Sequence, residues 1–132
     1  MLELDVCAAV IIRNGRFLLA TRPDNTHLAG HWEFPGGKQE IDETLEECII
    51  REIHEELHLE VFSASHITTV THHYPEKIIH LHFMHCKIDN NHHPVPQENQ
   101  KTEWYSPQEL PQCHLAPADR AYIDSYDLSS LL

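Results

Sequence analysis

The sequence contains no run of about 18 apolar residues, the length that a helix needs to cross a bilayer. Basic residues are also scarce: 9 Lys and Arg stand against 21 Asp and Glu, and the formal net charge is −12 at pH 7. A surface this acidic repels nucleic-acid phosphates and anionic lipid headgroups. We therefore expect no membrane span, no membrane partner and no nucleic-acid partner. Any phosphate chemistry should depend on metal ions held by carboxylates.

Closely spaced cysteines and the sequence pattern of a secretion signal are also missing. The four cysteines are scattered and form no C-x-x-C motif. The N-terminal segment has acidic residues, not basic ones, ahead of its apolar run, so we expect no signal peptide. We predict a cytoplasmic protein whose thiols are reduced and buried as small apolar side chains, namely Cys7, Cys48, Cys86 and Cys113.

The composition that remains is that of an ordinary globular protein. Of the 132 residues, 41% are hydrophobic and 23% are charged, which predicts one domain over residues 1–132. The dipeptide Asn14-Gly15 stands between apolar runs and predicts a hairpin within the first 22 residues. Further strands are expected at 32–34, 61–71, 77–88 and 102–105.

Capping boxes mark the expected helix starts. Thr44 and Glu47 form one box, and it opens a stretch with apolar residues every four positions, Leu45, Ile49, Ile53 and Leu57. This pattern predicts a helix that ends near Leu57–His58. A second box at 106–109 predicts another helix start, and a last helix is expected at about 117–126. Strands before and after the central helix predict a mixed α/β class.

The central helix carries an unusual concentration of carboxylates. At 100° per residue, Glu52, Glu55 and Glu56 fall within about 100° of one another. Such a cluster repels itself unless a cation is present, and oxygen ligands suit Mg²⁺ or Mn²⁺. The alternative is a solvated acidic face. The preceding Gly36-Gly37-Lys38 favours the metal interpretation, because glycine lets the backbone approach a ligand closely and lysine suits a phosphate.

The segment from Gly37 to Leu59 resembles the Nudix box, G-x5-E-x7-R-E-U-x-E-E-x-G-U, in which U is aliphatic. Every fixed position matches except the last glycine, where this sequence has His58. Histidine tolerates the left-handed conformation common after a helix at a cost of roughly 1 kcal/mol, so we expect His58 to affect stability alone. The segment at 32–38 looks like the entry to the box in the MutT branch of the family, and the segment at 115–119 is similar to the one that reads the base there. IIHLH at 78–82, taken with LAPAD at 115–119, looks closer to the CTP pyrophosphohydrolase members than to MutT itself.

The resemblance implies a Nudix fold, a mixed β-sheet sandwiched between α-helices, and a hydrolase that uses Mg²⁺, or alternatively Mn²⁺. It implies metal ligands at Gly36 (through its carbonyl), Glu52, Glu55, Glu56 and Glu98. Either Glu52 or Glu55 would take the proton from the attacking water, with Glu98 as a third candidate. Lys38 would assist catalysis by steadying the phosphates, and Arg51 with Glu43 would form a structural ion pair.

The substrate implied by the resemblance is a nucleoside triphosphate, cleaved to the monophosphate and pyrophosphate. The residues expected to contact it are Arg22, His27, Glu33, Phe34 and Asp119. An ionised Asp119 accepts hydrogen bonds only and suits a guanine-type edge, whereas a protonated one suits cytosine. Because an ionised aspartate is the default near neutral pH, we expect an 8-oxo-dGTP diphosphatase acting in nucleotide-pool sanitation and DNA repair.

Other functions remain open at this point. The first alternative is hydrolysis of CTP or of modified pyrimidine nucleotides. Less favoured are another Nudix diphosphatase, for example one for ADP-ribose, and a non-catalytic nucleotide-binding module. The intact trio of Glu52, Glu55 and Glu56 argues against the module, because mere binding does not require this repulsive cluster. The sequence leaves open whether the chain is a monomer or a homodimer.

Overall fold

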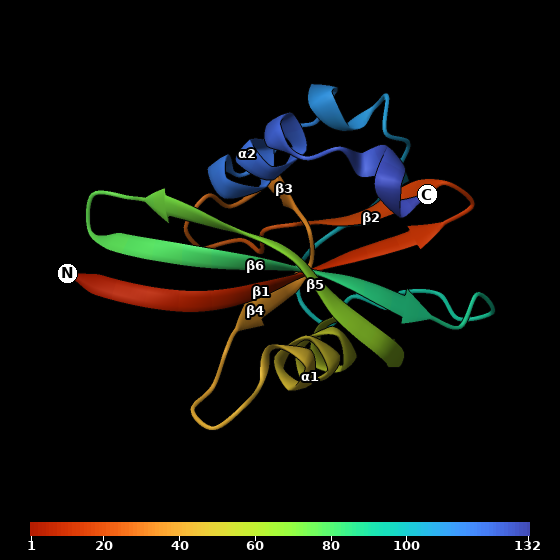
Figure 1. Ribbon diagram of the computed structural model, residues 1–132, viewed down its shortest axis with the longest axis horizontal. Coiled ribbons are helices and arrows are strands. Elements are labelled where there is room, and N and C mark those ends of the chain that lie inside the picture. The colour runs from red at the N-terminus through yellow and green to blue at the C-terminus, as the bar shows by residue number, and fades with distance from the viewer.

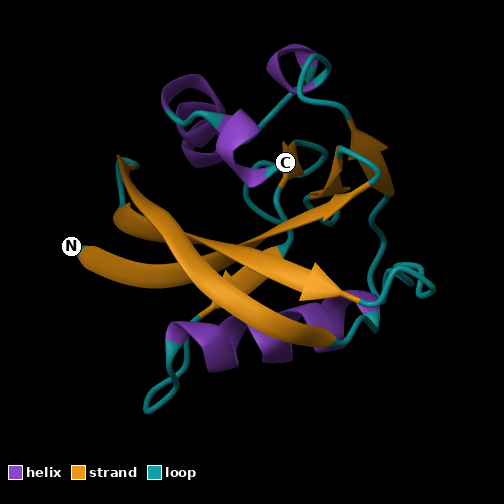
Figure 2. Cartoon of the chain, turned by 45° about the vertical axis from the view of Figure 1, so that its right-hand side comes forward, coloured by secondary structure: helices purple, strands orange, loops and turns teal.

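The computed structural model describes residues 1–132 and has a mixed β-sheet at its centre. Helix α1 covers one face of the sheet and helix α2 covers the other (Figures 1 and 2), which confirms the expected α/β sandwich. The elements in chain order are β1 Leu2–Arg13, β2 Arg16–Thr21, β3 Trp32–Glu33, β4 Gly36–Lys38, α1 Leu45–Leu57, β5 Val61–His73, β6 Lys77–Ile88, β7 Thr102–Tyr105, the 3₁₀ helix η1 Leu110–Gln112, α2 Pro117–Ser125 and the 3₁₀ helix η2 Leu128–Leu131. None of these helices is long and apolar enough to span a membrane.

Strand β1 organises the sheet. It runs parallel to β6 along most of its length, and it pairs antiparallel with β4 in its middle and with β2 at its end. The β1–β2 turn is made by Asn14 and Gly15, whose φ angles of 52° and 73° are those of the predicted two-residue hairpin turn. The main strand order is β3-β2-β1-β6-β5, with β4 paired to β1 and β7 to β2.

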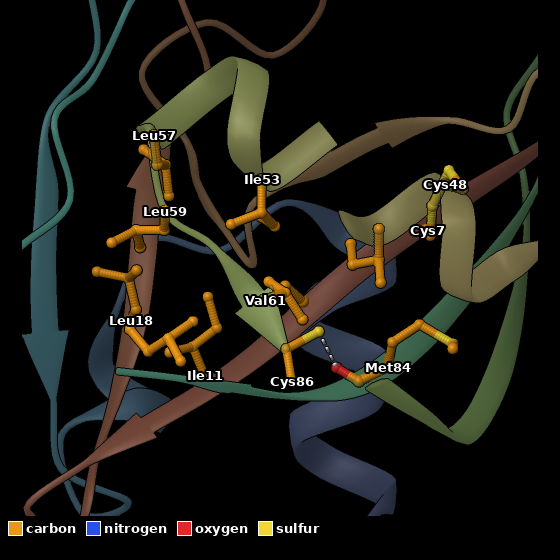
Figure 3. Packing of buried hydrophobic residues seen from close by; sticks show 13 residues of the cluster. Cys7, Ile11, Leu18, Cys48, Ile53, Leu57, Leu59, Val61, Met84 and Cys86 are labelled. Atoms are coloured by element: carbon orange, nitrogen blue, oxygen red, sulfur yellow. Dashed lines mark hydrogen bonds between the residues drawn. A yellow bond between two sulfur atoms is a disulfide. The ribbon is translucent and has the colours of Figure 1, made fainter. Parts of the chain in front are cut away.

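The alternation of side chains along β1 divides the core into two layers. Cys7, Ala9 and Ile11 face α1, whereas Ala8 and Val10 face α2. Figure 3 shows the α1 layer, in which side chains of α1 and β1 meet those of β2 and β6. Because both faces of β1 are covered, its central residues are almost all apolar.

Both ends of α1 agree with the sequence. Thr44 accepts from the N–H of Glu47 at 3.1 Å, and the Glu47 side chain accepts from the N–H of Thr44 at 2.9 Å. At the other end His58 is left-handed, with φ 53° and ψ 35°, and its N–H donates to the carbonyl of His54 at 3.0 Å. The predicted capping box and the predicted left-handed position are therefore both confirmed.

The prediction that all four cysteines are reduced is wrong for one pair. Cys7 of β1 and Cys48 of α1 form a disulfide across a sequence separation of 41 residues (Figure 3), while Cys86 and Cys113 are free. Both residues of the pair are fully buried. The spacing along the chain gave no hint of the pair, because it forms only when α1 packs on β1.

Two local expectations also change. Ser106 and Glu109 exchange the hydrogen bonds of a capping box, at 2.8 and 3.3 Å, but only turns and the 3₁₀ helix η1 follow them. Pro111 lies inside that segment and cannot donate a backbone hydrogen bond, so an α-helix is not propagated. In addition, Gly36–Lys38 pairs with β1 as strand β4, although its sequence reads as a loop.

Candidate active site

Two glycines place the β4 turn against its neighbours. A Cβ atom on Gly36 would lie 1.9 Å from the carbonyl oxygen of Cys7, and one on Gly37 would lie 2.2 Å from Oε2 of Glu52. Gly36 therefore admits no side chain, because the clash is with backbone, and a side chain at Gly37 would displace the carboxylate of Glu52. The backbone of β4 thus runs directly beside the first of the predicted glutamate ligands.

The predicted metal ligands surround one hollow, which we call the acidic cavity. Its volume is about 280 Å³ and no apolar residue lines it. The lining residues are Arg22, Pro23, Thr26, Glu33, Gly36, Glu52, Glu55, Glu56, Gln97 and Glu98. The structure therefore brings all five predicted ligands together, with Glu33 as a further carboxylate and a single basic side chain.

Burial and mutual repulsion leave two carboxylates of this cavity, those of Glu52 and Glu56, poorly stabilised as anions. Burial, assisted by the charges of Glu33 and Glu52, raises the pKa of Glu56 to about 8. Burial also raises the pKa of Glu52, against the opposing effect of the guanidinium of Arg51. Gln100 favours the charged form of Glu56 by donating to it from Nε2 at 3.1 Å. The same Nε2 also donates to the carbonyl of Thr21 at 3.0 Å.

This donor set fits a divalent cation. As the side chains stand, no three acidic, histidine or cysteine groups converge into a compact metal centre, and Arg51 engages both Glu52 and Glu55, at 2.8 and 3.2 Å. Mg²⁺ does not need such a centre, because it keeps several waters and takes only one or two carboxylates together with substrate phosphates. A cation would also offset the burial and the repulsion that together raise the pKa of Glu56.

A second hollow of mixed chemistry adjoins the acidic cavity, and we call it the mixed cavity. Its volume is about 300 Å³. It is lined by Leu4, Val6, Arg22, His27, Leu28, Glu33, Gly37, Lys38, Tyr74, Lys77, Ile79, Leu81, Ala116, Ala118 and Asp119. Arg22 and Glu33 line both cavities and form an ion pair at 3.3 Å. The two hollows therefore adjoin each other at this ion pair.

Asp119 is the most deeply buried charged residue that lines the mixed cavity. It lies in the first turn of α2, and backbone pairing between Ala116 and the carbonyl of Trp32, at 2.9 Å, holds this turn beside β3. Asp119 is 3% exposed and accepts from the N–H of Phe34 at 2.9 Å. Burial and the charge of Glu33 raise its pKa well above the usual value, against that hydrogen bond and the charge of Arg22.

The structure distributes the predicted substrate contacts unequally. Arg22, His27, Glu33 and Asp119 all line the mixed cavity, and Lys38 also lies there, outside the acidic cavity that holds the glutamates. The side chain of Phe34 is an exception. It is 2% exposed and packs edge-on against Phe17, Phe83 and Tyr122, so this residue meets the site only through its backbone N–H to Asp119.

Sequence reasoning missed two residues of the site. Gln100 bonds to Glu56, and Tyr74 lines the mixed cavity. Gln100 lies in a polar loop with no pattern that distinguishes it from its neighbours. Tyr74 directly precedes Pro75 in the β5–β6 turn, and only the tertiary fold brings that turn to the cavity.

Comparisons with known proteins agree with this geometry. The family model described as NUDIX domain matches residues 7–125. The chain belongs to the NUDIX domain family. Among NUDIX proteins, it is 38% identical over 127 residues to the CTP pyrophosphohydrolase of Escherichia coli, an alignment that covers 96% of this chain and 93% of that protein. It is 39% identical over 82 residues to the 8-oxo-dGTP diphosphatase of Proteus vulgaris, covering 61% of this chain and 73% of that protein.

A solved structure gives the same picture. The solution structure of the E. coli ORF135 protein superposes with a TM-score of 0.81 at 37% identity and covers 95% of this chain and 89% of its own. The predicted Nudix fold and the hydrolase class are thereby confirmed. Relatives with two different substrate names leave the base to be argued from this chain's own mixed cavity.

Proposed function

We propose that this chain hydrolyses nucleoside triphosphates to the monophosphate and pyrophosphate in the presence of Mg²⁺, with a cytosine base as its preferred substrate. The observation that carries the proposal is that the acidic and mixed cavities share Arg22 and Glu33. A triphosphate would lie among the glutamates and its base would lie against Asp119. Five glutamates in the acidic cavity would repel a bare triphosphate, so metal ions must accompany it.

The roles of the side chains follow from where they lie. Glu52, Glu55, Glu56 and Glu98, with the Gly36 carbonyl, would hold Mg²⁺, which supplies charge neutralisation on the phosphates and lowers the pKa of bound water. Glu52 or Glu55 would accept the proton of the attacking water, with Glu98 as the third candidate. Arg22 and Lys38 would hold the phosphates in place on the side of the mixed cavity.

The preference for cytosine rests on the protonation state of Asp119. A carboxyl buried to this degree beside Glu33 favours its neutral form, which accepts one hydrogen bond and donates another. Cytosine offers the matching pair, a donor at N4 and an acceptor at N3. This reverses the preference for oxidised guanine reached from the sequence, which assumed an ionised Asp119. The relative named CTP pyrophosphohydrolase supports the same direction.

An oxidised guanine nucleotide is the second candidate. The N–H of Phe34 donates to Asp119, and this hydrogen bond favours the ionised carboxylate that a guanine edge requires. Relatives named 8-oxo-dGTP diphosphatase support this candidate. The deciding experiment measures kcat/KM for CTP, dCTP, 8-oxo-dGTP and dGTP in Mg²⁺ at pH 7. The proposal expects the cytosine substrates to lead, and a lead for 8-oxo-dGTP would replace it with the second candidate.

The proposed location is the cytoplasm, where nucleotide pools are held. Disulfides are rare in that compartment, but Cys7 and Cys48 are both fully buried and therefore shielded from reducing agents while the chain is folded. Oligomeric state has no part in the proposal, because both cavities are built from one chain.

A further inference from the structure

Tyr74 brings together two segments that are distant in the sequence. Its N–H donates to the carbonyl of Lys77 at 2.8 Å and closes the β5–β6 turn. Its ring meets the ring of His27, in the β2–β3 loop, edge-on with 5.0 Å between the centroids. Both residues line the mixed cavity, so this contact forms part of its wall.

The neighbours of Tyr74 surround its ring and limit what the ring itself can do. His72 packs against it with 4.5 Å between centroids, and Nζ of Lys77 lies 5.5 Å from the ring centre. With His27, His72 and Lys77 already packed on it, the ring is a poor platform for stacking a base. Tyr74 lines the mixed cavity, and its hydroxyl makes no side-chain hydrogen bond within the chain, so the hydroxyl is free to interact with a ligand.

The charges that act on this hydroxyl belong to the base-binding end of the site. Burial and the charge of Asp119 raise the pKa of Tyr74, and the charges of Arg22 and Glu33 also reach it. The phenol therefore keeps its proton and stays a hydrogen-bond donor across the physiological range. Two nitrogens of Arg22 are already engaged, because Nη1 donates to Glu33 at 3.3 Å and Nε donates to the carbonyl of His27 at 2.8 Å, and the rest of the guanidinium is assigned above to the phosphates.

We propose that Tyr74 determines base specificity by donating a hydrogen bond from its hydroxyl to the carbonyl oxygen next to the two base atoms that Asp119 binds. The inference rests on the proposed function. Along the edge of cytosine the polar atoms are N4, N3 and O2, so a neutral Asp119 serves the first two and leaves O2 in need of a donor. Tyr74 supplies that donor without adding charge beside Asp119 and Glu33.

A cycle that changes one atom on the protein and one on the ligand tests this contact. For the wild type and for Tyr74→Phe, kcat/KM is measured with CTP and with 2-thio-CTP. The Kd values for CMP and 2-thio-CMP are measured in Mg²⁺ by calorimetry. Sulfur is a weak acceptor, so the wild type should favour the oxygen ligands by about three- to tenfold. Tyr74→Phe should lose about that factor toward the oxygen ligands and treat the oxygen and sulfur ligands alike, with kcat little changed.

Tyr105→Phe is the matched control, because it removes the same oxygen from a half-buried tyrosine that packs on Trp32 outside the mixed cavity. It should keep the wild-type ratio between oxygen and sulfur ligands. A wild-type ratio near one, or a Tyr74→Phe ratio equal to that of the wild type, overturns the role of Tyr74 while the pyrophosphohydrolase stands. A wild type that neither releases pyrophosphate from CTP nor binds CMP overturns the proposed function, and the Tyr74 contact to O2 with it.

Discussion

Arg51 donates hydrogen bonds to both carboxylate oxygens of Glu43, from Nε at 2.7 Å and from Nη2 at 2.8 Å. The same guanidinium donates to the carbonyl of Lys38 at 3.0 Å and to Glu52 at 2.8 Å. The hydrogen bonds from Arg51 to Glu43, together with one from the N–H of Glu40, lower the pKa of Glu43 to about 2, so this carboxylate is charged near neutral pH. The predicted ion pair is confirmed, and it joins β4, the loop after it and a predicted metal ligand.

Replacement of this guanidinium should impair catalysis by displacing the groups that it holds in position. Arg51→Lys keeps the charge but cannot hold two oxygens of Glu43 and the Lys38 carbonyl together. We expect kcat to fall roughly ten- to a hundredfold, because small displacements of catalytic groups are costly, and the Mg²⁺ concentration for half-maximal activity to rise. Steady-state kinetics over a Mg²⁺ series measures both. Arg16→Lys, at an exposed position, is the control. An Arg51→Lys enzyme with the same kinetics as this control would contradict the positioning role of Arg51.

His58 occupies a backbone conformation that glycine adopts more readily. His58→Gly should leave kcat unchanged and raise Tm by up to a few degrees, because the left-handed conformation costs histidine roughly 1 kcal/mol. His58→Gly also removes the stacking of the His54 and His58 rings, whose centroids are 6.0 Å apart, and this loss offsets part of the gain. Thermal unfolding and a turnover assay decide the matter. A large drop in kcat would show that His58 takes part in the chemistry.

Base preference should depend on pH through Asp119. Its raised pKa means that the neutral form dominates at lower pH and the ionised form gains as pH rises. The neutral form suits cytosine and the ionised form suits a guanine-type edge, so the ratio of kcat/KM for 8-oxo-dGTP to that for CTP should rise between pH 6 and 9. Effects on metal binding act on both substrates and cancel in this ratio.

Asp119→Asn is the control for that titration. An amide donates and accepts at every pH in the range, so the variant's ratio should be flat. Other titratable or charged groups of the mixed cavity, namely His27, Glu33, Arg22, Lys38, Tyr74 and Lys77, are unchanged in it. A wild-type ratio that is also flat, or a variant with the wild-type pH dependence, would remove Asp119 from base recognition.

The disulfide makes a simple count possible. Unfolded without reductant, the chain should show two reactive thiols, those of Cys86 and Cys113. In the folded protein only Cys113 should react quickly, because burial raises the pKa of Cys86 to about 12. Reduction should cost roughly 3–4 kcal/mol of unfolding free energy, as expected for a loop of this length. Thiol titration and melting with and without reductant test this, and four reactive thiols before reduction would exclude the cross-link.

The parts of the fold that sequence predicted correctly are local. The Asn14-Gly15 turn, the Thr44–Glu47 box and the left-handed His58 each depend on neighbours a few residues away, and each agrees with the structure. The spacing of Glu52, Glu55 and Glu56 on one helix also placed them in a common cavity.

The remaining features depend on contacts between distant segments. Cys7 and Cys48 meet only because α1 packs on β1, and Tyr74 meets His27 only because the β5–β6 turn reaches the β2–β3 loop. The protonation state of Asp119 depends on burial and on Glu33, neither of which a single sequence reveals. Local pattern thus located the candidate metal ligands, whereas the surroundings of Asp119 depend on the tertiary structure.

The most direct measurement of the central claim is pyrophosphate release from CTP in Mg²⁺ by the wild type, Glu56→Gln and Glu46→Gln. Glu46 is an exposed glutamate on the same helix and lies outside the acidic cavity, so its variant controls for the loss of one charge. We predict that the wild type and Glu46→Gln each release CMP and pyrophosphate in equal amounts. EDTA should abolish this activity and excess Mg²⁺ should restore it. Glu56→Gln should be at least about a hundredfold slower with its fold retained. Release of CDP and phosphate, or near-normal turnover by Glu56→Gln, would contradict the account.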